Sequence, residues 1–279
     1  MMGVSCGGQW VGSYTDRSRT YGSMGDSMLD IILYLLLAIG INVVIFIPAF
    51  VFQTDKLTDM SYSLTFILLV CIAFALSKMT SPQIIITCMI LIWALRLGLF
   101  LVIRIRRMGR DKRFDGIRES FGRFIRFWLL QGLSVWIISL PALFFITSEG
   151  IDVFMAGLAI WLAGIIIETT ADIQKYQFTH KSENKGRFID VGLWAYSRHP
   201  NYFGEILCWI GVYVYAYPSL TLLENLFGAA SPLFITILLL FVTGIPPLER
   251  YADRKWGKER AYKEYKRTTS VLIPWFKKR

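Results

Sequence analysis

The sequence predicts an all-α integral membrane protein with about seven transmembrane helices in one bundle. Hydrophobic residues make up 54% of its 279 residues, and the mean hydropathy is +0.49. Apolar runs of roughly 20 residues, the length that an α-helix needs to cross the hydrocarbon core of a bilayer, recur along the chain. We expect the spans at residues 28–52, 60–78, 83–104, 124–147, 151–170, 202–222 and 231–248.

The basic residues are distributed unevenly among the connections between these spans. Three segments, 104–126, 171–200 and 249–279, contain 25 of the 30 lysine and arginine residues. The connections at 148–151 and 219–230 contain none. Because basic connections tend to stay in the cytosol, we expect the N-terminus outside and the C-terminus in the cytosol.

The spans leave no room for a second domain, because no long linker separates them. Residues 1–27 are rich in glycine and serine, and we expect a disordered head there, followed by one seven-helix membrane domain at 28–279. The net charge of +10 lies mainly at the membrane borders, where it meets anionic lipid headgroups, so nucleic acid is not expected as a partner. Two histidines and four scattered cysteines offer no metal-ligand spacing, and no metal site is predicted.

The ionisable residues inside or at the ends of the spans fall in the predicted cytosolic half. They are Asp55, Asp59, Arg96, Glu168, Asp172 and Glu205. Arg96 precedes Arg104 by eight residues, which places it about 12 Å inside the membrane border. A charge at that depth needs a partner, and a structural ion pair that locks helix packing is one interpretation.

Two pairs of residues spaced four apart favour a second interpretation, a single polar pocket open to the cytosol. Glu168 and Asp172 form one pair, and Asn201 and Glu205 form the other, so each pair projects from one helix face. A dinucleotide would satisfy such a pocket, with its phosphates near the arginines of the cytosolic loops. The arginines that follow the third span either anchor the helix or contact phosphate, and the basic, aromatic tail either lies on the membrane surface or closes over a cofactor.

Three motifs in the second half of the chain resemble the steroid 5-alpha-reductase superfamily. They are Glu168-x-x-x-Asp172, Gly192-Leu-x-x-Tyr196-x-x-x-x-Asn201-Tyr-Phe-Gly204-Glu205, and Tyr262-x-x-Tyr265 with Leu272-Ile-Pro-Trp275. The resemblance covers residues 149–279, about half of the chain. The Arg198-His-Pro-Asn-Tyr segment looks most like a less characterised branch, known mainly as a domain of unknown function.

The resemblance implies a membrane-embedded reductase that binds NADPH from the cytosol and transfers hydride to a C=C bond conjugated to a carbonyl in a steroid-like or other lipid. The residues that it places at the cofactor are Glu168, Asp172, Tyr196, Arg198, Asn201, Tyr251 and Arg107. It places Gln53, Trp93 and Arg96 on the substrate side, and Glu205 beside the nicotinamide.

This sequence departs from the family pattern at the expected proton donor. Trp93 stands where the family has a tyrosine three residues before the arginine of the third span, and Gln53-Thr-Asp55 is the counterpart of a Gln-Glu pair. An indole donates a hydrogen bond but gives up no proton at useful pH. The carboxyl that polarises the carbonyl would then be Asp55, Asp59 or Glu205, kept protonated by apolar surroundings.

Two other functions stay open at this point. Arg198-His-Pro-x-Tyr202, followed about fifty residues later by an acidic residue, is also similar to isoprenylcysteine carboxyl and phospholipid methyltransferases, which use S-adenosylmethionine. A non-catalytic lipid-binding relative would bind cofactor without turnover. We expect the endoplasmic reticulum membrane in a eukaryote and the inner membrane in a bacterium.

Overall fold

The computed structural model describes residues 24–108, 114–148 and 152–276, and leaves out the side chains of residues 24–28, 59 and 104–108. The regular structure of the described residues is helical, apart from one bridge between Ser197 and Ser270. The long helices are α1 (Met24–Val51), α2 (Lys56–Ala75), α3 (Ser81–Met108), α4 (Phe121–Thr147), α5 (Met155–His180) and α6 (Pro200–Ala216). The shorter elements are η2 (Ser182–Asn184), η3 (Gly192–Ala195), η4 (Tyr217–Ser219), α7 (Leu222–Gly228), α8 (Ala230–Ile237), η5 (Leu238–Val242), α9 (Ile245–Trp256) and α10 (Arg260–Thr268).

Within the described part of the chain, six helices are long and apolar enough to cross a membrane. They are α1 to α5 and a composite helix that runs through α7, α8 and α9 over Leu222–Trp256. The remaining predicted span corresponds to α6, which has 17 residues, the lower limit for a spanning helix. The prediction of a multi-pass, all-helical membrane protein is therefore confirmed, whereas the count of seven spans and the orientation stay predictions. The predicted head, 1–27, lies almost entirely outside the described residues.

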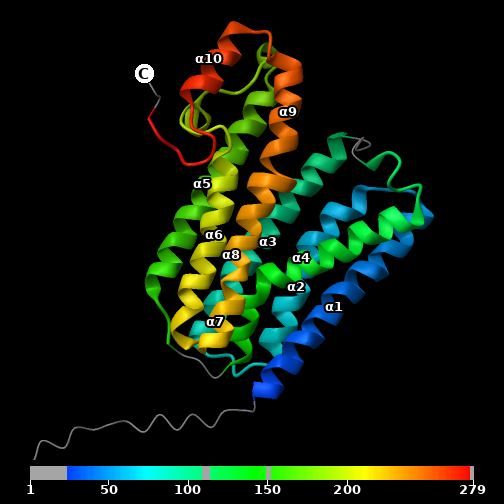
Figure 1. Cartoon of the computed structure of the whole chain (residues 1–279), viewed down its shortest axis with the longest axis vertical. Helices are drawn as coiled ribbons and strands as arrows, with labels where there is room; N and C mark the ends of the chain where they lie inside the picture. Colours follow the sequence, from blue (N-terminus) through cyan, green and yellow to red (C-terminus); the bar gives the residue numbers. More distant parts are fainter. Residues whose placement is uncertain (1–23, 109–113, 149–151, 277–279) are drawn as a thin grey trace, which may run out of the picture.

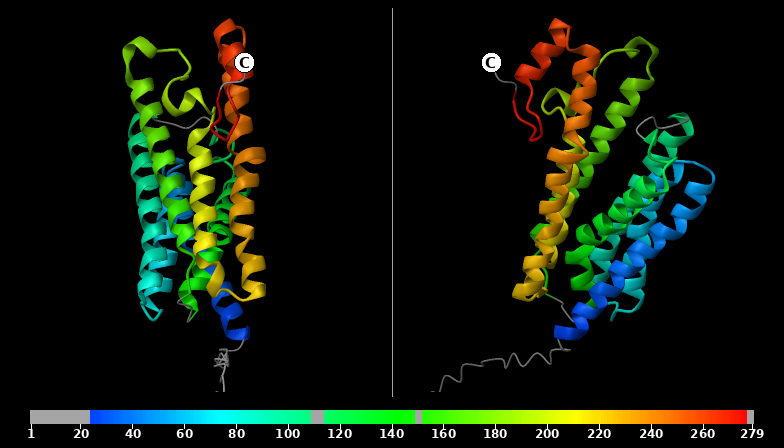
Figure 2. Two further views of the ribbon diagram at one scale, coloured as in Figure 1. Left: turned by 90° about the vertical axis from the view of Figure 1, so that its left-hand side faces the viewer. Right: turned by 45° about the vertical axis from the view of Figure 1, so that its right-hand side comes forward.

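The helices form two groups that approach each other near the start of α1 and diverge toward the opposite end (Figures 1 and 2). Helices α5, α6 and the composite α7–α9 lie on one side, and α1, α2 and α4 lie on the other. Helix α3 packs mainly against α2. The diverging end carries the last turns of α3, α5 and α9 together with α10. We call it the basic end, because the lysine- and arginine-rich connections lie there.

The composite helix changes its hydrogen bonding near its middle, and two prolines explain the change. Pro246 and Pro247 have no N–H, so the α-helical ladder cannot continue through them. Instead, the amide of Thr243 donates to the carbonyl of Leu238 at 2.9 Å, the five-residue spacing of a π-helix. Helix α9 then begins at Ile245. The break redirects α9, which carries two acidic side chains of the basic end.

Helices α5 and α6 approach closely because glycines face each other across their contact. A Cβ atom on Gly164 would lie 2.7 Å from backbone atoms of Gly204 and Cys208. A Cβ atom on Gly204 would lie 2.6 Å from the backbone nitrogen of Glu168. Small residues allow membrane helices to pack at such distances. The contact brings the polar turns of α5 beside the first turns of α6.

A satisfied polar network joins α1, α2 and α4 inside the bundle. The Gln131 amide donates to Asn42 Oδ1 at 2.9 Å and to Ser61 Oγ at 2.6 Å, and Asn42 donates to Thr65 Oγ1 at 3.1 Å. Polar side chains in hydrocarbon need partners of this kind. The network fixes the rotation of α2 relative to its neighbours, and therefore which face of α2 points at α3 and α6.

Candidate functional site

An aromatic layer closes the centre of the bundle on one side of the candidate site. Phe66 of α2 lies 5.2 Å, between ring centroids, from both Trp93 of α3 and Trp209 of α6, and the two tryptophans are 4.9 Å apart. All three side chains are at most 1% exposed. Two of these ring pairs pack edge to face and the Phe66–Trp209 pair is tilted, and rings packed so closely fill space and exclude water.

A polar layer follows one helical turn closer to the basic end. Helix α3 runs toward the basic end, so Arg96 lies closer to that end than Trp93 does. Helices α2 and α6 run away from it, so the earlier residue of each pair lies closer to the basic end. These residues are Tyr62, before Phe66, and Glu205, before Trp209. The spacings of three and four residues put each pair on one helix face. Helices α2, α3 and α6 therefore each place a polar side chain at the same depth of the bundle: Tyr62, Arg96 and Glu205.

Arg96 joins α3 to α5 through two carboxylates. Its Nη1 lies 2.9 Å from Asp172 Oδ2, and its Nη2 forms an ion pair with Glu168. The Trp93 indole also donates to Glu168, at 3.2 Å. The three charged side chains are 15%, 13% and 5% exposed, in the order Arg96, Asp172 and Glu168. The structural ion pair expected for Arg96 is thus present, and its partners are two of the residues predicted to line a polar pocket.

Helix α6 adds Asn201 and Glu205 to this cluster. The Asn201 side chain hydrogen-bonds to the Asp172 carboxyl. Glu205 interacts electrostatically with Arg96 but makes no hydrogen bond to another described residue. The Nε of Arg96 is also buried without a partner among the described residues. One guanidinium therefore faces three carboxyl groups, and both signs of charge keep hydrogen-bonding capacity for a ligand.

A second ion network lies at the basic end, around Glu249 of α9. Arg198 Nη1 donates to Glu249 Oε2 at 2.6 Å, and His199 Nε2 lies 2.9 Å from Oε1. Burial lowers the pKa of His199, and the neighbouring Lys175 and Arg198 act in the same direction, against its hydrogen bond to Glu249. His199 is therefore neutral at pH 7, and the network ties the start of α6 to α9.

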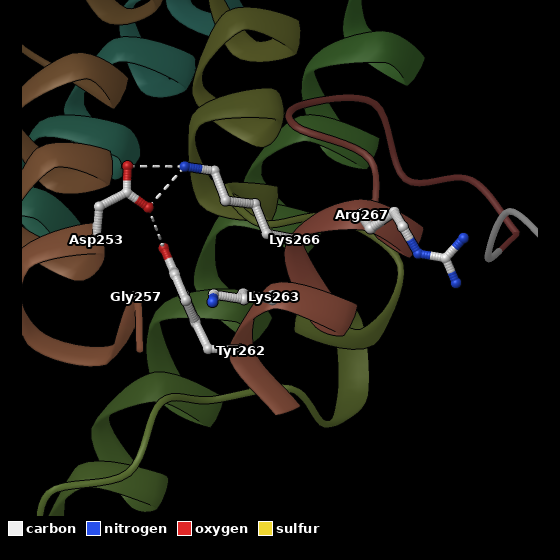
Figure 3. Close-up of a pocket in the computed structure, with 6 residues that line it drawn as sticks. All are labelled: Asp253, Gly257, Tyr262, Lys263, Lys266 and Arg267. Carbon is white, nitrogen blue, oxygen red and sulfur yellow. Dashed lines mark hydrogen bonds and ion pairs between the residues drawn. The ribbon is translucent and has the colours of Figure 1, made fainter. Parts of the chain in front are cut away.

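Helix α10 packs beside α9, and the two helices line an open pocket of about 310 Å³ (Figure 3). Lys266 donates to the two Asp253 oxygens at 2.6 and 2.8 Å, and Tyr262 donates to Oδ1 at 3.2 Å. Lys266 also lies 3.3 Å from Glu249. Burial lowers the pKa of Lys266, but its hydrogen bonds to Asp253 and Glu249 outweigh that effect, so the pKa is raised. These contacts anchor α10 to α9.

The remaining predicted site residues lie outside the cluster or outside the described side chains. Asp55 is buried and forms an ion pair with Arg118. Gln53 is exposed in the α1–α2 turn with a φ of 48°, and its amide donates to the Phe50 carbonyl at 2.7 Å. The other four divide as follows: Tyr196 and Tyr251 are surface residues, 46% and 54% exposed, and the side chains of Asp59 and Arg107 are not described.

Several residues of these networks were not predicted from the sequence, among them Glu249, His199 and Tyr62. Glu249 and His199 carried no assigned role, although the spacing of an acidic residue about fifty positions after Arg198-His-Pro was itself a signal. Tyr62 gave no signal, because a tyrosine in an apolar span is typical of membrane helices. Its electrostatic interactions with Glu205 and Glu168 appear only in the folded protein. No group of three or more side chains suited to a metal occurs within the described residues.

Comparison with known proteins identifies relatives for this arrangement. A family model described as protein of unknown function, DUF1295, matches residues 45–269. The chain is also similar to 3-oxo-5-alpha-steroid 4-dehydrogenase 1 of Mus musculus, with 26% identity over 121 residues, which is 43% of this chain and 42% of the mouse protein. The chain therefore matches less than half of that relative's length. No solved structure matches the chain.

Proposed function

Because the chain belongs to the DUF1295 family and to the wider 5-alpha-reductase-like superfamily, we propose that it is a membrane-embedded, NADPH-dependent reductase. Its substrate would be a steroid-like or other lipid with a C=C bond conjugated to a carbonyl. The observation that supports this proposal best is the convergence of Arg96, Asp172 and Glu205 from three helices at one depth of an apolar bundle. Charged side chains at that depth are costly, and they usually serve a ligand.

The polar cluster suits the nicotinamide and ribose half of NADPH. Carboxylates accept hydrogen bonds from ribose hydroxyls and from a carboxamide, and Asn201 both donates and accepts. The carboxyl of Glu205, which makes no hydrogen bond to another described residue, supplies such a group. Arg198 is less available for phosphate than the sequence predicts, because Glu249 already binds it. The arginines in the last turn of α3 and beyond it, Arg107 among them, are then the phosphate ligands that we propose.

NADPH, when bound, would supply the hydride for such a reduction. The chain itself would hold the cofactor through Asp172 and Asn201 and exclude water with the Phe66, Trp93 and Trp209 layer. A dry site strengthens each electrostatic interaction within it. Glu205, the carboxyl without a hydrogen bond to the described residues, is our candidate acid near the carbonyl. Asp55 is a weaker candidate, because Arg118 already binds its carboxylate.

The substrate class follows from the surroundings and from the relative. The helix surfaces are apolar, so an acceptor would arrive from the bilayer. The name of the mouse relative describes 4-dehydrogenation of a 3-oxo-5-alpha-steroid. That reaction places a C=C bond in conjugation with the 3-oxo group, and its reverse reduces such a bond. We therefore propose a steroid-like enone as the first compound to test.

The test is NADPH consumption by the purified protein in detergent, with cholestenone as the enone. We expect turnover with NADPH, and at least a 100-fold loss of kcat for Glu205→Gln, in line with the usual contribution of a general acid. Full activity of Glu205→Gln would remove Glu205 as the acid. Absence of NADPH consumption with a series of enone lipids, by protein that remains folded, would contradict the reductase proposal.

A second candidate function is supported by the Glu249 network. The Arg198-His199-Pro motif and the acidic residue downstream are the two elements that also resemble membrane methyltransferases, and the structure brings them into direct contact. In that alternative the same end of the bundle would bind S-adenosylmethionine. Stabilisation of the protein by S-adenosylmethionine, and not by NADPH, would favour this function.

A further inference from the structure

Tyr62 reaches the polar layer from α2, and no role is assigned to it by the sequence motifs. It lies one turn before Phe66, and the two rings pack edge to face with centroids 5.2 Å apart. Phe66 in turn contacts Trp93 of α3, which precedes Arg96 by one turn. It also contacts Trp209 of α6, which follows Glu205 by one turn. The Tyr62 hydroxyl therefore lies at the depth of those two charges, and it interacts electrostatically with Glu205 and Glu168.

The Tyr62 hydroxyl is an available hydrogen-bond donor at that depth. The two Nη groups of Arg96 are engaged by carboxylates, and the Trp93 indole donates to Glu168. Two other donors lack a partner among the described residues, Arg96 Nε and Trp209 Nε1, but both atoms are fully buried. Tyr62 is only half-buried, and its hydroxyl makes no hydrogen bond to another described residue. A ligand that enters the polar layer would therefore meet this hydroxyl without displacing a hydrogen-bond partner among the described residues.

The chemistry of the proposed substrate requires a donor of this kind. A carbonyl oxygen that enters an apolar bundle loses its hydrogen bonds to water, and an unpaired polar atom is costly there. Ionised carboxylates offer no hydrogen to it. A phenol is a neutral hydrogen-bond donor. In a dry site its hydrogen bond becomes stronger as negative charge develops on the carbonyl oxygen of the substrate.

We propose that the Tyr62 hydroxyl binds the carbonyl oxygen of the lipid substrate, in place of Trp93 of α3, whose indole already donates to Glu168. This inference rests on the proposed reductase function and specifies its substrate: a lipid whose carbonyl end, and not its hydrocarbon end, points at α2.

The experiment distinguishes the contribution of the Tyr62 hydroxyl to binding from that of its ring. It also distinguishes the contribution of the ligand's carbonyl from that of its hydrocarbon. Binding of cholestenone and of cholestene, which differ in the carbonyl oxygen, is measured by quenching of tryptophan fluorescence in detergent with NADP⁺ present, so that no turnover occurs. We expect Tyr62→Phe to weaken cholestenone binding about 10-fold, the effect of one hydrogen bond, and to leave cholestene binding and NADPH stabilisation unchanged. Tyr34→Phe, which removes a hydroxyl from a buried tyrosine of α1, is the control and should change neither.

Equal binding of cholestenone by wild type and Tyr62→Phe would overturn the inference. An equal loss for both ligands would overturn it too, because it would show that Tyr62 acts through packing alone. Failure of wild-type protein to be stabilised by NADPH would instead refute the reductase function, and the role of Tyr62 with it. The two failures are therefore distinguishable.

Discussion

Replacement of Arg96 by methionine tests how the charged cluster is held together. Methionine keeps most of the length and apolar volume of the side chain but leaves Glu168 and Asp172 without their shared partner. Both carboxylates are at most 13% exposed, so water compensates little. Removing one partner of a buried ion pair costs about 3 to 5 kcal/mol, and two carboxylates share this arginine, so we expect a loss at or above the lower figure. That is a large part of the roughly 5 to 15 kcal/mol by which a domain is stable.

The assay is an SDS titration of the protein in mixed micelles, followed by circular dichroism. Arg126→Met, at an exposed arginine of α4, is the matched control and should stay within about 0.5 kcal/mol of wild type. Neutralising both acids in addition, with Glu168→Gln and Asp172→Asn, should recover much of the lost stability. Wild-type stability of Arg96→Met, or no recovery in the triple variant, would refute the cost assigned to the unpaired buried carboxylates.

Three further predictions follow from the contacts around the site. Gly164→Ala should destabilise the protein by about 1 to 3 kcal/mol in the same titration, because its Cβ would lie 2.7 Å from the Gly204 carbonyl oxygen; a neutral effect would mean that α5 and α6 pack less closely. Asn201→Ala should weaken NADPH binding by about 1 to 3 kcal/mol, since it leaves the Asp172 carboxyl short of a partner; unchanged affinity in a thermal-shift titration would remove Asn201 from the cofactor site. Burial lowers the pKa of His199 below its ordinary 6.5, so the unfolded chain binds the proton more readily, and the melting temperature should fall as pH drops through and below 6.5. His199→Gln should lose that dependence, and an identical pH profile in the variant would assign it to another group.

The sequence predicts the membrane class and most of the helices because lipid imposes long apolar segments, which are visible without tertiary information. It misplaces some ends for local reasons. The fifth span continues ten residues past 170, as α5 ends at His180, because a spanning helix need not stop at the membrane border. The last span proves to be part of a composite helix interrupted before Pro246.

The candidate site is predictable where polar residues recur at helical spacing. Glu168 with Asp172, and Asn201 with Glu205, could be placed on common faces from the sequence, and Arg96 could be identified by its depth. The partners could not be predicted, because they depend on packing between distant segments. Arg198 bonds to a residue 51 positions away, and Asp55 bonds to one 63 positions away. Tyr62 joins the polar layer only because the network around Gln131 sets the rotation of α2.

Cofactor-dependent stabilisation of the purified protein tests the central claim most directly. Thermal unfolding in detergent is compared with NADPH, NADH and S-adenosylmethionine at matched concentrations. A ligand present at 100 times its dissociation constant stabilises the folded state by about 2.7 kcal/mol, which a melting curve resolves. We predict a shift with NADPH that is reduced in Asn201→Ala. A shift with S-adenosylmethionine alone would contradict the reductase account and favour the methyltransferase.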